Sequence, residues 1–118
     1  QVVENFDYGE KQVCLMLDIS ITYESDTERA LSVLAEEVAA HPDYLDPRTP
    51  EQIADGEPLV TVRVQELADS AVVLRALLWG PDNGTAFGMR CDLLRSLKTR
   101  FDAEGIAFAY PHMHIVQD

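Results

Sequence analysis

The chain has 118 residues, the size of one ordinary domain, and 47% of them are hydrophobic, which is too many for a disordered protein. Nine basic residues against 21 acidic ones give a net charge of −12, which argues against binding to nucleic-acid phosphates or to anionic lipid. The acidity has two interpretations at this point: it keeps the protein soluble, or it produces a field that concentrates cations.

The first predicted element is a strand over residues 12–23, followed by a helix. Ser25 and Glu28 have the spacing of a capping box at the start of this helix. The helix is predicted to end before Pro42, because the residue before a proline disfavours the helical conformation. Apolar residues recur in the strand at every second position and therefore share one face: Val13, Leu15, Leu17, Ile19 and Ile21. The buried side of the helix is predicted to hold Leu31, Leu34, Val38 and His41, with Glu36 and Glu37 outside.

Residues 42–58 are rich in proline and are predicted to form a long surface loop. One helical turn is expected to begin at Pro50, since proline suits the first position of a helix. Two strands follow, over residues 59–67 and 70–79, because apolar and polar residues alternate again. Their short separation predicts a tight hairpin with its turn at residues 68–69.

A second helix is predicted over residues 85–104, after a turn at residues 80–84. Gly105 suits the position just after it, because glycine adopts the left-handed conformation that ends many helices. A last strand is expected to begin at Ile106 and to be interrupted at residues 110–111. The order strand, helix, strand, strand, helix, strand predicts an α+β fold of the ferredoxin-like, split βαβ type. The buried face of the second helix is predicted to consist of Phe87, Cys91, Leu94, Leu97 and Phe101.

Few residues point to chemistry. His112 and His114 lie two apart, so a strand would place both on one face, but zinc needs at least a third ligand and only Asp118 is near in sequence. Cys14 and Cys91 have no second cysteine at metal-ligand spacing, so we expect buried free thiols. The sequence has no nucleophile, phosphate-binding or dinucleotide-binding motif. We therefore expect no catalytic site, no cofactor and no metal.

Three stretches of the sequence carry a family resemblance. They run from Ile19 to Asp26, from Val64 to Trp79 and from Asp92 to Met113. The third is the most specific, with a helix ending in Phe-Asp-x-x-Gly-Ile and then Phe-x-Tyr-Pro-x-Met. Together they resemble the C-terminal cytoplasmic region of the small-conductance mechanosensitive ion channels, the MscS-like family. Two features depart from the family pattern: Ala109 stands where proline is common, and the loop at residues 43–58 is longer than usual.

The resemblance implies a structural part of an ion channel of the inner membrane that opens under osmotic stress, and not an enzyme. It implies a homoheptamer whose cytoplasmic domains enclose a hollow vestibule below the pore, with side portals between subunits. The sequence has no run of about 18 apolar residues and no signal peptide. We therefore expect the membrane part of such a channel to lie outside these 118 residues.

The resemblance also implies a division of the chain into three segments. Residues 1–11 would be the exit from an upstream β domain, residues 12–110 the ferredoxin-like domain, and residues 111–118 the segment that adds one strand to a β-barrel shared between subunits. The residues implied in the barrel and its approach are Tyr110, Pro111, His112, Met113, His114, Ile115 and Val116.

Two other hypotheses stay open. A small-molecule-sensing module can have the same fold, because a fold does not determine a function. Such a module is expected to have a glycine-rich ligand loop after its first strand, where this chain has Tyr23-Glu24-Ser25-Asp26. A metal-binding or trafficking domain would instead use His112 and His114, and a Zn²⁺ titration would test it.

Overall fold

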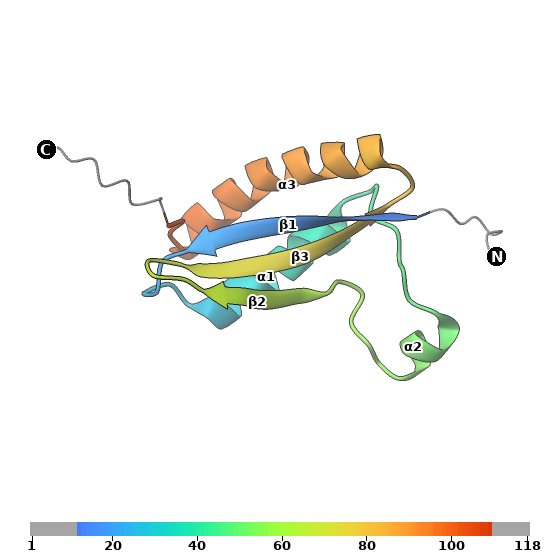
Figure 1. The fold of residues 1–118 in the computed structure, drawn as a ribbon, viewed down its shortest axis with the longest axis horizontal. Coiled ribbons are helices and arrows are strands. Elements are labelled where there is room, and N and C mark those ends of the chain that lie inside the picture. The colour runs from blue at the N-terminus through green and yellow to red at the C-terminus, as the bar shows by residue number, and fades with distance from the viewer. Residues whose placement is uncertain (1–11, 110–118) are drawn as a thin grey trace, which may run out of the picture.

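Three antiparallel strands form one sheet at the centre of the fold (Figure 1). The structure, a computed structural model, describes residues 12–109. The strands are β1 (Val13–Ile21), β2 (Val62–Leu67) and β3 (Val72–Gly80). They lie in the order β1-β3-β2, so β3 pairs with both of the others and β1 and β2 form the two edges. The pairing of β1 with β3 is in register over the whole length of both strands.

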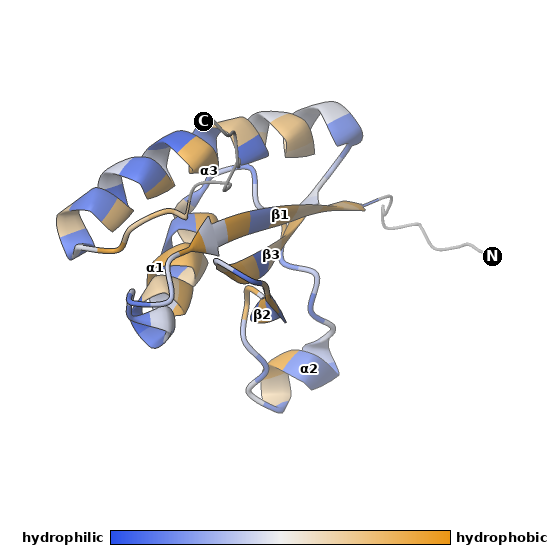
Figure 2. Cartoon of the chain, turned by 60° about the vertical axis from the view of Figure 1, so that its left-hand side comes forward, coloured by the Kyte–Doolittle hydropathy of each residue, from blue (hydrophilic) through white to orange (hydrophobic). Residues whose placement is uncertain are grey.

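Two long helices cover one face of this sheet, and a third, short helix lies in the loop before β2 (Figures 1 and 2). They are α1 (Thr27–Ala40), α2 (Pro50–Ala54) and α3 (Asn83–Glu104). Helix α1 packs against β2 and β3, whereas α3 packs against β1 and β3, and the two helices contact one another. The hydrophobic core lies between them and the sheet.

The alternation predicted for the first and third strands is confirmed. Every second residue of β3 is buried, and the residues of β1 that share this face are buried towards its C-terminal end. The opposite face is open in the described part of the chain, and Met16 there is 53% exposed. The buried residues of the two strands are Leu17, Ile19, Ile21, Val72, Leu74, Ala76 and Leu78.

The starts of both long helices differ from the prediction. Asp26, not Ser25, is the N-cap of α1, and its carboxylate accepts the backbone N–H of Arg29 at 3.1 Å. Helix α3 begins two residues earlier than expected because the carboxylate of Asp82 accepts the N–H of Thr85 at 2.7 Å. Because aspartate and serine are both good N-caps, the sequence alone does not show whether Ser25 or Asp26 caps α1.

The ends of the helices agree better with the sequence. Helix α1 stops at Ala40, two residues before Pro42, and Gly105 ends α3 in the left-handed conformation with φ 75°. Residues Leu34 and Val38 of α1 are buried as predicted. Leu31 is only partly buried, and His41 lies just beyond the helix as its C-cap. The short helix α2 begins at Pro50 as expected.

The predicted buried face of α3 is partly wrong. Leu97 and Phe101 are buried, but Phe87 is 57% exposed, Leu94 is 36% exposed and Cys91 is exposed. The helix carries two apolar stripes, and only one faces the sheet. The buried stripe continues along the whole helix, whereas the exposed one stops at Lys98. The buried residues of α3 are Ala86, Met89, Leu93, Leu97 and Phe101.

The hairpin and the last strand also differ in detail. The turn between β2 and β3 has Asp69 and Ser70 at its centre, one residue later than predicted, and is closed by the Ala68 N–H to the Ala71 carbonyl at 2.8 Å. The strand predicted to begin at Ile106 is, within residues 12–109, a single antiparallel bridge between Phe108 and Ile21. The described residues therefore form an α+β fold with a small antiparallel sheet of three strands.

The burial of α3 gives a testable prediction. Phe101→Ala should lower the free energy of unfolding by about 3–5 kcal/mol, because a fully buried ring is removed from the core. Phe87→Ala in the same helix is the matched control and should change it by less than about 0.5 kcal/mol, since its ring is exposed. Urea unfolding measures both, and equal losses would show that the helix does not bury the stripe described above.

Candidate functional site

The last described residues of the chain are held at the outer edge of β1. The Thr22 N–H donates to the Ala107 carbonyl at 3.0 Å, and the Ala109 N–H donates to the Ser20 carbonyl at 2.9 Å. Ser25, which does not cap α1, accepts the Ala107 N–H on its hydroxyl at 3.0 Å. Residues 106–109 are therefore attached to the end of β1 and the loop after it, and we call them the exit segment.

The exit segment is also tied to α3. The rings of Phe101 and Phe108 are stacked, with centroids 5.1 Å apart and planes inclined by 28°. Ile106 is buried, and its N–H donates to the Phe101 carbonyl at 2.9 Å. Because Gly105 reverses the chain between these residues, the end of α3 determines where the chain meets β1.

The predicted site residues follow directly after the exit segment. All of them lie outside residues 12–109, so their contacts stay a prediction. The described structure shows the residue directly before them, Ala109, whose N–H donates to the Ser20 carbonyl of β1. These residues are Tyr110, Pro111, His112, Met113, His114, Ile115 and Val116.

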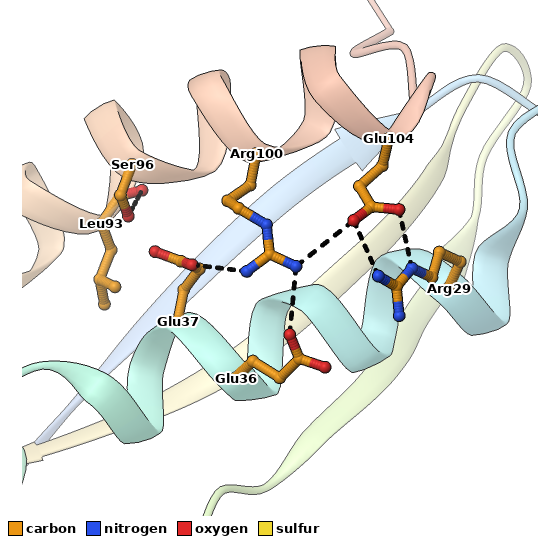
Figure 3. Close-up of polar contacts among 7 residues, drawn as sticks. All are labelled: Arg29, Glu36, Glu37, Leu93, Ser96, Arg100 and Glu104. Carbon is orange, nitrogen blue, oxygen red and sulfur yellow. Dashed lines mark hydrogen bonds and ion pairs between the residues drawn. The ribbon is translucent and has the colours of Figure 1, made fainter.

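A network of ion pairs joins the exposed sides of α1 and α3 (Figure 3). Arg100 of α3 contacts Glu37 at 2.8 Å and Glu36 at 3.1 Å, both on α1. Arg29 of α1 binds both carboxylate oxygens of Glu104 on α3, at 2.9 and 2.7 Å. Glu104 also lies 3.5 Å from Arg100, so one chain of charges crosses from helix to helix twice.

Neighbouring arginines lower the pKa of three carboxylates in the described structure. The hydrogen bonds from Arg29 lower the pKa of Glu104 below its usual value. On the open face of the sheet, Arg75 binds both oxygens of Asp18 across the strands at 2.8 and 3.0 Å and lowers the pKa of Asp18. Arg48 likewise lowers the pKa of Asp46 in the loop after α1. These carboxylates carry their full negative charge at neutral pH.

The sequence did not indicate this network. Glu36 and Glu37 were expected to face water, and they do lie on the outer side of α1, but Arg100 of α3 meets them there. Within α3, the spacing of Arg100 and Glu104 by four residues is typical of an ion pair along one helix. The partners between helices depend on how α1 and α3 pack, which no spacing within one helix reveals.

The two cysteines and His41 lie outside this ion-pair network. Within residues 12–109, no three histidine, cysteine, aspartate or glutamate side chains lie close enough to hold a metal ion. Cys14 and Cys91 are free thiols as expected, but both are exposed rather than buried. Partial burial raises the pKa of the Cys14 thiol, which disfavours the reactive thiolate. His41 bridges α1 and α3 through Asp92 at 2.9 Å and accepts the Asp43 N–H, a structural role.

Comparison with known proteins identifies a family that covers most of this chain. The sequence matches the family described as "Mechanosensitive ion channel MscS, C-terminal" over residues 15–108. The chain belongs to this family. The match covers both long helices, β2 and β3 completely. It also covers β1 from its third residue and the exit segment up to residue 108. The resemblance stated from the sequence is confirmed, and the family is one of ion channels.

A solved structure of an MscS protein shows the same fold. The crystal structure of Helicobacter pylori MscS in its closed state superposes on this chain with a TM-score of 0.69 at 13% sequence identity. The match covers 92% of this MscS-family chain but only 39% of the Helicobacter chain. This chain therefore corresponds to a minor part of that protein's length. In the described part of the chain, no helix is long and apolar enough to cross a membrane.

The ion-pair network gives a prediction about pH. Because Glu104 has a lowered pKa in the folded state, it contributes stability above its unfolded pKa that is lost as pH falls through the folded pKa. The difference in unfolding free energy between the unmodified chain and Glu104→Gln should therefore shrink between pH 6 and about pH 3. Urea unfolding at a series of pH values measures it.

Glu24→Gln is the control for this experiment, because Glu24 is exposed and forms no ion pair among the described residues. Its effect should stay small and nearly constant over the same pH range. A difference for Glu104→Gln that does not change with pH would contradict the role of the Arg29 pair.

Proposed function

We propose that this chain is the cytoplasmic vestibule domain of a tension-gated ion channel used in osmotic protection. Seven copies would surround a vestibule below a pore that other parts of the full-length protein form in the cell inner membrane. The partners of the domain would be its own copies and the permeating ions. The proposal assigns it no catalysis, no cofactor and no contact with nucleic acid. Membership of the channel family over residues 15–108 supports it.

The register in which the exit segment meets β1 supports the proposed division of the chain. Phe108 lies opposite Ile21, and the Ala109 N–H points at β1 and donates to the Ser20 carbonyl. In an antiparallel ladder every second residue of a strand points its N–H to the same neighbour. The residue whose N–H would next be needed by β1 is therefore residue 111, opposite Asp18.

Residue 111 is a proline and has no N–H to donate. A continued fourth strand would leave the Asp18 carbonyl without its partner, and proline is disfavoured at such positions of a strand. Regular pairing of the chain with its own β1 is therefore expected to stop near Tyr110. This supports the proposal that residues 12–110 form the ferredoxin-like domain and that residues 111–118 leave it.

We propose that residues 112–116 form one strand of a β-barrel shared by the copies. The side chains of His112, Met113, His114, Ile115 and Val116 would then lie in that barrel. A lone strand that leaves its own sheet has two open edges and needs neighbours, and identical strands from other copies supply them. Residues 1–11 would connect the domain to an upstream β domain in the same protein.

The acidity of the chain supports a filtering role for the vestibule. Each copy carries a net charge of −12. Charges on the inner wall of a ring act over a Debye length of about 8 Å at physiological ionic strength. Cations would be enriched within that layer as they approach the pore.

A small-molecule-sensing module is the alternative function, and the start of α1 argues against it. A helix N-terminus binds anionic ligands through its free N–H groups. Here the carboxylate of Asp26 already accepts the Arg29 N–H and places a negative charge at that end. A ligand with a carboxylate or phosphate would be repelled.

The proposed function predicts currents gated by pressure. The full-length protein, expressed in membranes without other mechanosensitive channels, should open under stepped suction in a patch-clamp recording. In a salt gradient its reversal potential should shift towards that of the cation, because the acidic vestibule enriches cations. A clear anion preference would contradict the filtering role, and silence of a protein shown to be in the membrane would contradict tension gating.

The proposed barrel predicts a loss of assembly without a loss of folding. Replacement of residues 112–116 by Gly-Ser-Gly-Ser-Gly in the full-length protein should reduce the oligomer seen by native mass spectrometry. The isolated chain with the same change should unfold at the same urea concentration as before. The matched control replaces residues 51–55, mostly within α2, which buries none of its residues. Equal loss of oligomer in both variants would refute the barrel.

A further inference from the structure

The imidazole of His41 is almost enclosed where α1 ends, between α3 and the start of the loop at residues 42–58. Its side chain is only 9% exposed. It lines a surface hollow together with Pro42 and Asp43 of the loop and Asp92 of α3. Histidine is the side chain that ordinarily changes its charge between about pH 5 and pH 8. A proton that binds this ring therefore reaches a place where a helix end, a loop and a second helix meet.

Both ring nitrogens of His41 have a hydrogen-bond partner, and these partners determine where the ring proton lies. The backbone N–H of Asp43 donates to Nδ1 at 3.1 Å, so Nδ1 carries no proton. The neutral ring therefore has its proton on Nε2, which donates to the Asp92 carboxylate at 2.9 Å. One imidazole thus holds the loop through one nitrogen and α3 through the other.

A second proton on the His41 ring must bind at Nδ1, and there it excludes the Asp43 N–H. An imidazolium has two donors and no acceptor, so two N–H groups would point at one another. The contact with Asp92, in contrast, becomes an ion pair, and hydrogen bonds between charged groups are the stronger ones. Protonation therefore breaks the contact with the loop and strengthens the contact with α3.

Negative charges surround the ring and favour its protonated form. Each element that packs on the ring contributes one carboxylate to the hollow: Glu37 from α1, Asp43 from the loop and Asp92 from α3. The C-terminal end of α1, which His41 caps, adds the partial negative charge of the helix dipole. The imidazolium would therefore have several groups to stabilise it.

Other groups favour the neutral ring. Burial disfavours the charged form of any histidine. Arg100 binds Glu37 at 2.8 Å, and Arg95 lines a second hollow together with Asp92, so both arginines offset part of the negative charge. The hydrogen bond from the Asp43 N–H exists only in the neutral form. The ring therefore has stabilising groups for each of its two charge states, as a switch requires.

The bond that protonation breaks holds the first turn of the loop, at residues 42–43. The other bond across this turn, from the Tyr44 N–H to the His41 carbonyl, is longer at 3.2 Å. Beyond the turn the chain is held independently, because the Leu45 N–H donates to the Trp79 carbonyl at 2.9 Å. Loss of the Asp43 bond therefore acts on the turn and leaves the rest of the loop attached.

We propose that His41 is a pH switch between two arrangements of the turn at residues 42–43. In the neutral form, Nδ1 accepts the Asp43 N–H. In the protonated form, Nδ1 has taken a proton from solvent and donates it to the Asp43 carboxylate, which lines the same hollow. Acidification thus loosens the start of the loop and ties the end of α1 more firmly to α3. This inference goes beyond the proposed function and does not depend on it, because every group involved belongs to one chain.

NMR of the 118-residue chain tests the switch, with His112→Asn and His114→Asn so that His41 is the only histidine left. At about pH 8 the ring should carry its proton on Nε2 alone. From there down to about pH 5, the Asp43 amide signal should follow the same titration curve as the His41 ring. Hydrogen exchange of this amide, relative to its intrinsic rate, should rise about two- to tenfold, as expected for the loss of one hydrogen bond.

His41→Asn is the matched control. Its side-chain oxygen can accept the Asp43 N–H in place of Nδ1 but takes up no proton in this pH range. The Asp43 amide should therefore stay unchanged from about pH 8 to about pH 5. Asp92→Asn keeps an acceptor for Nε2 but removes the charge, so the transition of the Asp43 amide should move to lower pH.

Four results would each overturn the inference. They are a proton on Nδ1 at the start of the titration, a ring that does not titrate over the range, an Asp43 amide that stays constant while the ring titrates, and a transition that Asp92→Asn leaves in place. All are measured on the chain itself. A failure of tension gating in the full-length protein would therefore leave the switch unaffected, and loss of the switch would leave the proposed function standing.

Discussion

Packing of one face of α3 across β1 and β3 is the interaction on which the other features of this domain depend. It buries a stripe that ends in Phe101, and Gly105 then turns the chain back towards the sheet. The turn leaves Ile106 in the core and stacks Phe108 on Phe101. The exit segment therefore reaches β1 at one place and in one register. The segment proposed to build the barrel starts from that place.

The charged network between α1 and α3 has a different role from the core. Its side chains are partly exposed, and ion pairs in water contribute little to stability. They instead favour one relative position of the two helices. Arg29 binds both oxygens of Glu104, and Arg100 contacts two carboxylates of α1. A fixed shape would suit the proposed ring of copies.

The shape of the sheet suits a part that is completed by its neighbours. One face is closed by two helices, but both edges and the other face remain open among the described residues. A chain of this size buries only about two-thirds of its unfolded surface, so contact with further copies would add stability. Open strand edges are a liability in a monomer unless other chains or segments cover them.

Sequence patterns predicted β1, β3, the helix ends and the family. Alternation revealed β1 and β3 because a strand with one buried face must repeat every two residues, and Pro42 and Gly105 end helices through their own backbone chemistry. Phe101, Gly105 and Tyr110 also carried the family resemblance, which does not depend on packing. Tertiary structure alone decided which stripe of α3 is buried, since Phe87 and Leu94 are as apolar as Met89 and Leu93. It also decided that Ser25 binds the exit segment and that Arg100 joins Glu36 and Glu37, because these partners come from elements far apart in the chain, which meet only when the helices pack on the sheet.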